Sequence, residues 1–376
     1  SIAKMLKAAG YATGAFGKWH LGYDDRYNPV HHGFDEYFGQ LLGHADYFRH
    51  IYYDGTYALR DGLEISKAEG YFTDLVNERA VQFIDKHKDE PFFLYVPHLA
   101  VHAPFQPPGE TAPKVTPQNM LEGSREIYRA MLERVDQGIG MILERLDRYG
   151  IAENTLVVFS SDNGGVVMPY GGQTNQQAAE FPLNLEDDGD NYVTANYRRA
   201  QVMASEAGHH TVGSLRGRKH SIYEGGFRVP YMVRWPGHTK PGTTCPEVVS
   251  LVDTLATCAG IMGEPLPRNG AEDSYDVLPA WLGRKLDKPI REAVVVHNAE
   301  GVFAIRQGPW KLIEERTWDD KIRSPWRAEA VNQLYHLGND PQEKNNVWDQ
   351  NPAVVTRLRG LLKKYLNEKE YHEVFL

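Results

Sequence analysis

The chain has 376 residues, of which 41% are hydrophobic and 24% charged, and its formal net charge is −9. No apolar run approaches the ~20 residues that a membrane helix needs, so we expect no spanning segment. The acidic balance and the lack of a Lys/Arg run argue against a nucleic-acid surface, and two cysteines are too few for a disulfide scaffold.

Helical and strand patterns alternate through the first half of the chain. Apolar residues at helical spacing before Gly10 predict a helix over "SIAKMLKAAG", and "YATGAFG" predicts a short strand after it. We expect further helices beginning at Thr73 or Asp74 and at Ser124, the second ending at Gly150, and buried strands over "PFFLYV" and "TLVVFSS". This alternation predicts a largely parallel sheet covered on both faces.

Polar residues follow three of these predicted strands. They are Lys18 and His20 after the first, His98 and His102 after the second, and Asp162 and Asn163 after the third. Because ligands bind beyond the carboxyl ends of the strands in such sheets, we expect one crevice to hold these side chains. If the first segment stays extended, Lys18 and His20 point to one side.

A long excursion and a basic loop follow. Residues 164–211 show no strong period and predict a loop over the crevice. "GRKHSIYEGG" then places Lys219 before a tight turn, from which a loop could carry it to the crevice. We expect a strand near 227–234 and a helix over 246–261.

The texture of the chain changes beyond about residue 285. Short strands with turn signals between them predict an antiparallel sheet, and a helix over 353–371 closes the chain. The predicted fold class is α/β, with a large, mostly parallel sheet sandwiched by helices over residues 1–284. A smaller C-terminal antiparallel sheet with a terminal helix covers residues 285–376.

The crevice residues suit chemistry on a tetrahedral anion. Lys18, His20, His102 and Lys219 would surround a sulfuryl or phosphoryl group and neutralise its oxygens. Asp162 and Asn163 offer oxygen ligands to calcium or magnesium, although calcium takes 6–8 oxygens and further ligands must come from elsewhere. Taken singly, each group has an ordinary reading, as a solvated lysine, a structural histidine or an Asp-Asn-Gly-Gly turn.

Several segments together resemble the type I sulfatase family of the alkaline phosphatase superfamily. In chain order these are "GYATGAFGKWHLG", "HHGFDEYFG", "PFFLYVPHLAVHAPFQPP", "VVFSSDNGG", "GRKHSIYEGGFRVP", "WKLI" and "QLYHLGNDPQEKNNV". The resemblance covers nearly the whole chain. It implies a sulfuric ester hydrolase that uses one calcium ion and a formylglycine nucleophile made from a cysteine or serine.

The resemblance also implies a role for individual residues. Lys18 and His20 match the pair that contacts the nucleophile and the sulfate, His102 matches the histidine beside the leaving group, and Lys219 matches the lysine on the sulfate and bridging oxygen. Asp162 and Asn163 match two calcium ligands. Attack of the hydrated formylglycine on sulfur would then proceed with Lys219 and His102 assisting the departing alcohol. His98 has no equally firm counterpart.

One part of the family pattern is missing. The nucleophile motif Cys/Ser-x-Pro-x-Arg does not occur in this sequence, and no Asp-Asp pair precedes Lys18. Cys245 and Cys258 lie in the wrong motif and region. The family has its first, central strand before the helix at which this chain starts. We therefore expect that a nucleophile-bearing segment was not included, that this chain alone is inactive, and that a sheet lacking that strand exposes unpaired edges.

Two other functions stay open. The same architecture serves phosphodiesterases and phosphonate hydrolases, and a chain that keeps the cleft without the nucleophile would be a non-catalytic protein that binds sulfated glycans. We expect two long loops, over residues 23–71 and 164–211, and their aromatic and histidine residues favour a carbohydrate sulfate as substrate, although they could equally pack the loops. These residues include Tyr47, Tyr52, Tyr53, His209 and His210. By resemblance alone, the location is periplasmic, secreted or lysosomal.

Overall fold

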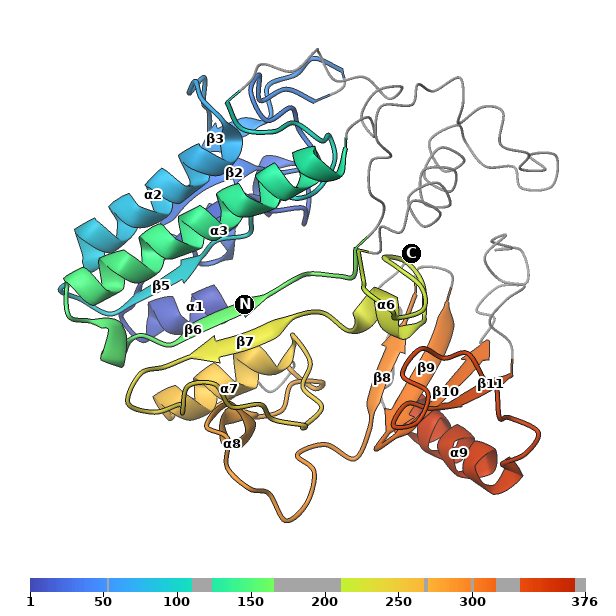
Figure 1. Ribbon diagram of the computed structural model, residues 1–376. Coiled ribbons are helices and arrows are strands. Elements are labelled where there is room, and N and C mark those ends of the chain that lie inside the picture. The colour runs from blue at the N-terminus through green and yellow to red at the C-terminus, as the bar shows by residue number, and fades with distance from the viewer. Residues whose placement is uncertain are drawn as a thin grey trace, which may run out of the picture.

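Figure 1 shows the chain as a computed structural model, which describes residues 1–52, 54–109, 124–165, 211–266, 270–298, 301–315 and 332–368. The longest helices lie together at one side of the molecule, and a smaller sheet with the C-terminal helix lies at the other. Of the described helices, none combines the length and the apolar character needed to cross a lipid bilayer.

The N-terminal part is built on a five-stranded sheet of order β4-β3-β2-β1-β5. Helix α1 (Ile2–Ala8) precedes the strands, which are β1 (Ala12–Lys18), β2 (Glu36–Gln40), β3 (Leu59–Asp61), β4 (Glu64–Ile65) and β5 (Phe92–Tyr95). β1 runs parallel to both β2 and β5, and Lys18 lies opposite Gln40 in the register. The carboxyl ends of β1, β2 and β5 therefore meet at one edge of the sheet.

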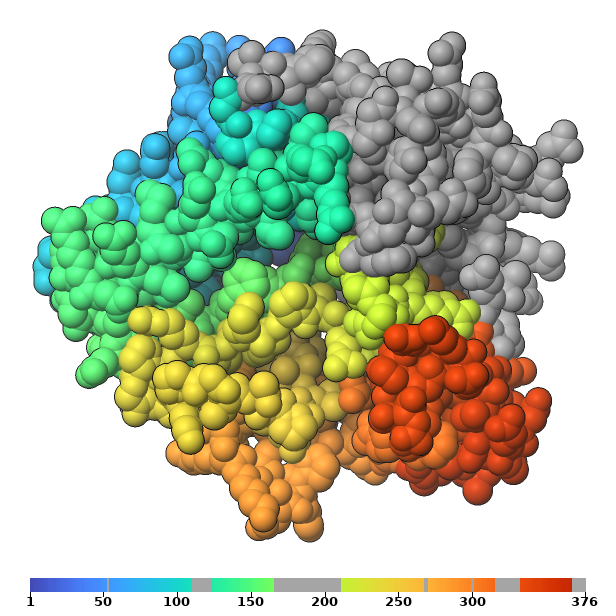
Figure 2. Space-filling model, in the orientation of Figure 1, coloured from blue at the N-terminus to red at the C-terminus, as the bar shows by residue number. Residues whose placement is uncertain are grey.

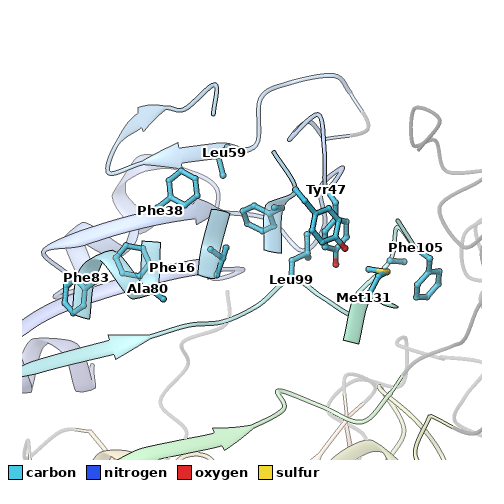
Figure 3. Close-up of a cluster of buried hydrophobic side chains, with 13 residues drawn as sticks. Phe16, Phe38, Tyr47, Leu59, Ala80, Phe83, Leu99, Phe105 and Met131 are labelled. Atoms are coloured by element: carbon cyan, nitrogen blue, oxygen red, sulfur yellow. The ribbon is translucent and has the colours of Figure 1, made fainter. Parts of the chain in front are cut away.

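Two long helices cover one face of this sheet. α2 (Phe72–His87) and α3 (Arg125–Arg148) lie side by side (Figure 1) and are joined by Arg134, whose Nη2 donates to Asp74 Oδ2 at 2.7 Å. Phe16, Phe38 and Phe83 belong to the buried cluster beneath them, drawn in Figure 3. Burying aromatic side chains of this size contributes about 1.5–3 kcal/mol each, so this cluster holds the sheet edge rigid.

A separate two-stranded sheet lies beyond β5. β6 (Val157–Ser160) pairs antiparallel with β7 (Tyr231–Arg234), after the short helix α6 (Glu224–Phe227). Helices α7 (Asp253–Met262) and α8 (Leu278–Trp281) follow. Among the described residues, β5 is hydrogen-bonded only to β1 and β6 only to β7, so each strand has an unpaired edge.

The C-terminal sheet has the order β11-β10-β9-β8, and all of its neighbouring strands are antiparallel. Its strands are β8 (Val294–His297), β9 (Val302–Gln307), β10 (Trp310–Glu315) and β11 (Gln333–His336). Helix α9 (Pro352–Glu368) packs on one face through Val355, Leu358 and Leu362. The opposite face packs against Ile222 and Tyr223, close to Lys219 in the chain.

The predicted fold class is confirmed: helices cover a mixed sheet with a parallel centre, and a small antiparallel sheet carries the terminal helix. The cap at Ser124 is also confirmed, since its side chain accepts from Ile127 N at 3.2 Å. The domain boundary at residues 284 and 285 stays a prediction. The excursion predicted over 164–211 falls almost entirely on residues 166–210, which lie outside the described ranges.

Several element bounds differ from those predicted. The loop expected between residues 23 and 71 contains β2, β3 and β4, because Tyr37 and Phe38 are both buried and break the alternation that reveals a strand. The strand expected from residue 227 begins at 231, after α6. The helix expected from residue 246 begins at Asp253, because the preceding valines disfavour a helix and Ser250 N instead donates to the Asp253 carboxylate.

Candidate active site

Lys18 and His20 reach the end of β1 by different backbone conformations. Lys18 is the last residue of β1, and its N–H donates to Pro97 O at 2.7 Å. His20 N donates to Leu41 O at 3.0 Å, but its φ is +57°, in the left-handed region. The expected extended segment is therefore wrong at His20, where the chain turns.

His98 and His102 follow β5. The Nδ1 of His102 lies 2.7 Å from Ala103 O. Because a carbonyl oxygen only accepts, this contact assigns the hydrogen to Nδ1 and leaves Nε2 as an acceptor in the neutral ring. Tyr47 Oη donates to His102 O at 2.9 Å and fixes the backbone behind the ring.

Burial dominates the acid–base behaviour of these two histidines. It lowers the pKa of His102 to about 3, helped by the positive charges of Lys18 and Lys219. It lowers the pKa of His98 to about 4, and the buried Nδ1 of His98 has no hydrogen-bond partner among the described residues. Both rings are therefore neutral near pH 7.

Asp162, Asn163 and Lys219 come together through backbone hydrogen bonds between two loops. Asp162 and Asn163 follow β6 and are succeeded by Gly164, whose N–H donates to Gly226 O at 3.0 Å. Lys219 N donates to Gly165 O at 3.2 Å. These two bonds fasten the Lys219 loop, residues 216–226, to the loop after β6.

One cavity of about 2840 Å³ is lined by all six predicted site residues and by His98: Lys18, His20, His98, His102, Asp162, Asn163 and Lys219. Burial and the charge of Lys219 lower the pKa of Lys18, and the Asp162 carboxylate acts in the opposite direction. Burial and both lysines lower the pKa of His20. The structure thus brings groups from three strand ends and one loop close enough to interact electrostatically.

No carboxylate of the described residues forms an ion pair with either Lys18 or Lys219. Within the described ranges, neither the Lys18 nor the Lys219 ammonium group makes an ion pair within 4.0 Å. Two positive charges that repel each other in one cavity favour the binding of an anion, because an anion relieves their repulsion.

The described residues supply only part of a metal site. Asp162 and Asn163 carry hard oxygen donors at the cavity, and the Asn163 amide nitrogen donates to Gly164 O at 3.0 Å, which leaves its side-chain oxygen available. Among the described residues, no group of three or more His, Cys, Asp or Glu side chains could hold a metal ion. The donor chemistry fits calcium, with the remaining ligands still to be supplied.

Away from these polar groups, the cavity continues as an apolar slot between β5 and β6. Side chains of both strands, α3 and α7 line this slot, including Phe92, Leu94, Leu146, Val157 and Met262. Figure 2 shows the surface hollowed between the green α3 and the yellow segment around β7. The slot lies between the two unpaired strand edges.

Two of the residues expected to face a sugar, Tyr47 and Tyr52, are buried. Tyr47 has no exposed surface and lies in the core cluster of Figure 3, and Tyr52 is 5% exposed. Tyr53, His209 and His210 lie outside the described residues. For Tyr47 and Tyr52 the packing interpretation therefore holds, whereas Tyr23, whose ring centroid is 6.0 Å from that of Tyr52, is 46% exposed.

Sequence reasoning missed one histidine. His44 follows β2, and burial together with the charges of Lys18 and His20 lowers its pKa. His44 lies four residues beyond the carboxyl end of β2, a strand that the sequence pattern does not predict. Recognising "EYFGQ" as a strand would have found it.

A model of the sulfatase family matches residues 1–264. The chain belongs to the sulfatase family. A second model, of the C-terminal part of N-sulphoglucosamine sulphohydrolase, matches residues 217–371, which include Lys219 and the whole C-terminal sheet. The resemblance drawn from the sequence motifs is thereby confirmed.

Two curated relatives and one solved structure illustrate the likeness. The N-acetylgalactosamine-6-O-sulfatase of Bacteroides thetaiotaomicron is 30% identical over 96% of this chain, which spans 76% of that protein. The human N-acetylgalactosamine-6-sulfatase is 29% identical over 77% of this chain, which spans 50% of it. The crystal structure of Ps i-CgsB superposes with a TM-score of 0.70 at 28% identity, covering 97% of this chain and 73% of that one.

Proposed function

We propose that this chain provides the sulfate-binding and leaving-group residues of a sulfuric ester hydrolase that acts on a carbohydrate sulfate. The observation that carries the proposal is that Lys18 and Lys219, which have no ion-pair partner in the described part of the chain, line one cavity together with His20, His102 and an Asp-Asn pair. The family membership and the names of the relatives, which are sulfatases of N-acetylgalactosamine, support this choice of substrate class.

In this proposal the two lysines hold the sulfate oxygens. Fixed positive groups in a partly buried site stabilise charge that develops on those oxygens at little reorganisation cost. Lys18 contributes from the rigid end of β1, and Lys219 from its loop. His20, which responds to the charge of both lysines, supplies a further hydrogen bond to the anion or the nucleophile.

His102 is proposed to pass a proton to the departing alcohol. Its lowered pKa leaves the ring neutral in this structure, with the Nε2 lone pair available. A bound sulfate would counter the charges of Lys18 and Lys219 and raise the pKa of His102, so that the ring takes up a proton when substrate is present. Lys219 would assist at the bridging oxygen.

Asp162 and Asn163 are proposed to hold a calcium ion through their side-chain oxygens. Calcium, when bound, would neutralise the ester oxygens and fix their orientation. The Gly164 and Lys219 backbone bonds between the two loops keep these oxygens beside the anion. Further oxygen ligands are needed, as the described residues provide too few for calcium.

The formylglycine nucleophile is proposed to come from a segment that this sequence does not include. No Cys/Ser-x-Pro-x-Arg motif occurs in it, and burial raises the pKa of the Cys258 thiol to about 11, which keeps that thiol protonated. The apolar slot supports the proposal, because two unpaired strand edges accept a further strand. Such a strand would end between Lys18 and Asp162.

The proposal is tested on the protein made from its complete gene. We expect hydrolysis of N-acetylgalactosamine 6-sulfate or an aryl sulfate, and a loss of about 10²–10⁴-fold in kcat for His102→Ala. His238→Ala, an exposed histidine that does not line the cavity, is the matched control and should turn over normally.

Each alternative gives a distinct result in this assay. Turnover of phosphonate or phosphodiester substrates in preference to sulfate esters would assign the phosphonate hydrolase function. Binding of sulfated oligosaccharides in calorimetry without turnover would assign the binding function. Normal turnover by His102→Ala would refute the role of His102. Export to the periplasm, a lysosome or the medium, proposed from the family, is tested by cell fractionation.

A further inference from the structure

Three motifs that the proposed chemistry leaves unused meet in one buried cluster. Lys311, from "WKLI", is 2% exposed, and its Nζ lies 3.0 Å from Glu224 Oε1 of "YEGG" and 2.9 Å from Glu343 Oε1 of "DPQE". Glu224 N donates to Glu343 Oε2 at 2.7 Å. Glu224 is 6% exposed and Glu343 is fully buried, so this ion cluster lies away from solvent.

The backbone of Glu343 is strained to complete the cluster. Its φ is +52°, in a region that residues with side chains rarely adopt and that persists only where the surroundings enforce it. Here the carboxylate faces Lys311, and the carbonyl oxygen accepts from Arg216 Nη1 at 3.0 Å. The strain therefore serves a connection between the C-terminal sheet and residue 216.

Arg216 and Glu224 stand near the two ends of the Lys219 loop. Arg216 Nη1 also donates to Tyr335 Oη at 2.9 Å, and its guanidinium carbon lies 3.8 Å from the Tyr223 ring centroid. Gly225 N donates to Arg216 O at 2.7 Å and closes the loop at its base. The ion cluster and Arg216 thus hold both ends of the loop against the C-terminal sheet.

The loop is held on both of its sides, by the C-terminal sheet and by the loop after β6. Ile222 and Tyr223 pack on Ala304, Ile313 and other residues of the C-terminal sheet. Toward the cavity, the loop makes backbone hydrogen bonds to Gly164 and Gly165. Because side chains at both ends of the loop are held by the C-terminal sheet, a shift of that sheet would move the Lys219 ammonium group.

We propose that Lys311, together with Glu224 and Glu343, is a positioning group for Lys219, through which the C-terminal sheet sets the geometry of the anion site. This inference rests on the proposed function in taking Lys219 as the sulfate-binding lysine. In this proposal the "WKLI" and "DPQE" motifs contribute to anion binding as well as to folding.

The test compares variants of the protein made from its complete gene, at a temperature at which each is folded. Lys311→Met removes the charge, and Lys311→Arg is the conservative variant. Arg359→Met is the matched control. Arg359 Nε pairs at 2.7 Å with Glu314, which lies on β10 as Lys311 does, and neither Arg359 nor Glu314 bonds to the described residues of the Lys219 loop. Amide hydrogen exchange over residues 216–226 and calorimetry with inorganic sulfate are measured for each.

Lys311→Met should accelerate exchange in the Lys219 loop and weaken sulfate binding by about 10- to 100-fold, the size expected for a group displaced by about 1 Å. Lys311→Arg should restore most of the slow exchange in the loop and most of the sulfate affinity. Arg359→Met should change neither the exchange nor the affinity. Unchanged loop exchange in Lys311→Met, or equal acceleration throughout the protein, would overturn the proposal. If Lys311→Met does not fold, Glu343→Gln, which keeps the shape of the side chain, is judged by the same two readouts.

A Lys219→Ala variant separates this inference from the proposed function. It should abolish sulfate binding and leave exchange in the Lys311 cluster unchanged. Sulfate binding at the wild-type level by Lys219→Ala would refute the anion role of Lys219. In that case the exchange data on Lys311→Met still decide whether the C-terminal sheet positions the loop.

Discussion

The buried Lys311 and the half-buried Lys18 have opposite surroundings. Lys311, in the C-terminal sheet, lies within 3.0 Å of carboxylate oxygens of both Glu224 and Glu343. Lys18, at the end of β1, has no carboxylate within ion-pair distance among the described residues, and burial and the charge of Lys219 lower its pKa. Lys311 is therefore paired with carboxylates, whereas among the described residues Lys18 has only the more distant charge of Asp162 to offset the repulsion from Lys219.

We interpret this difference as that between a structural ion cluster, at Lys311, and a proposed anion-binding site, at Lys18. A buried charge costs several kcal/mol unless a partner compensates it, so an uncompensated lysine is retained only where something else is gained. At Lys18 the proposed gain is the binding of an anion in the cavity. At Lys311 the gain is the connection between the C-terminal sheet and the Lys219 loop.

The largest expected effect tests this comparison directly. Lys311→Met should lower the free energy of unfolding by about 3–5 kcal/mol, because it leaves the buried Glu343 carboxylate without its cation and Glu224 with Arg306 alone, at 3.9 Å. Lys18→Met should leave stability unchanged or raise it, while activity falls by about 10²–10³-fold. Chemical denaturation and turnover assays measure both; equal destabilisation by the two variants would remove the distinction.

The next effect concerns the bonds between the two loops at the site. A Cβ at Gly164 would lie 1.7 Å from Gly225 O, so Gly164→Ala must displace the Lys219 loop. We expect this variant to lower the free energy of unfolding by about 1–3 kcal/mol and to lose most of the activity. Gly140→Ala is the control, since nothing lies within 4 Å of its added Cβ in the exposed face of α3. The free energy of unfolding of Gly140→Ala should rise by about 0.5–1 kcal/mol. A lower free energy of unfolding in both variants would argue against loop displacement as the cause.

A gradual effect should appear on acidification. The pKa of His102 is lowered from 6.5 to about 3 and that of His98 to about 4, so the unfolded chain binds more protons than the folded one below pH 6.5. Stability should therefore be kept above pH 6.5 and fall by up to about 1.4 kcal/mol per pH unit for each ring below it. Denaturation at pH 7 and pH 5 tests this, and His98→Gln should flatten the dependence; an unchanged slope contradicts it.

The smallest effect is expected at an exposed pair. Arg359 and Glu314 are 40% and 25% exposed as side chains, so Arg359→Met should change the free energy of unfolding by less than about 1 kcal/mol. Thermal or chemical denaturation measures the change. A loss approaching that of Lys311→Met would mean that burial does not distinguish these ion pairs.

Local patterns in the sequence determined much of the fold. Ser124 caps α3 as its side chain predicts, and the alternating strands of the C-terminal region form the antiparallel sheet. The end of β1 at Lys18 also follows from the sequence, as does the convergence of polar groups beyond β1, β5 and β6. Spacing within one element reports these features because it depends only on neighbouring residues.

The tertiary structure alone decided which distant segments meet. Tyr47 and Tyr52 look suited to a sugar in sequence, yet packing buries both, and β2 is hidden because the sheet is covered on both faces. No spacing rule joins Glu224 to Lys311 or Glu343, which lie 87 and 119 residues further along the chain. Such contacts arise from the packing of the C-terminal sheet against the Lys219 loop, and a pattern of neighbouring residues carries no record of that packing.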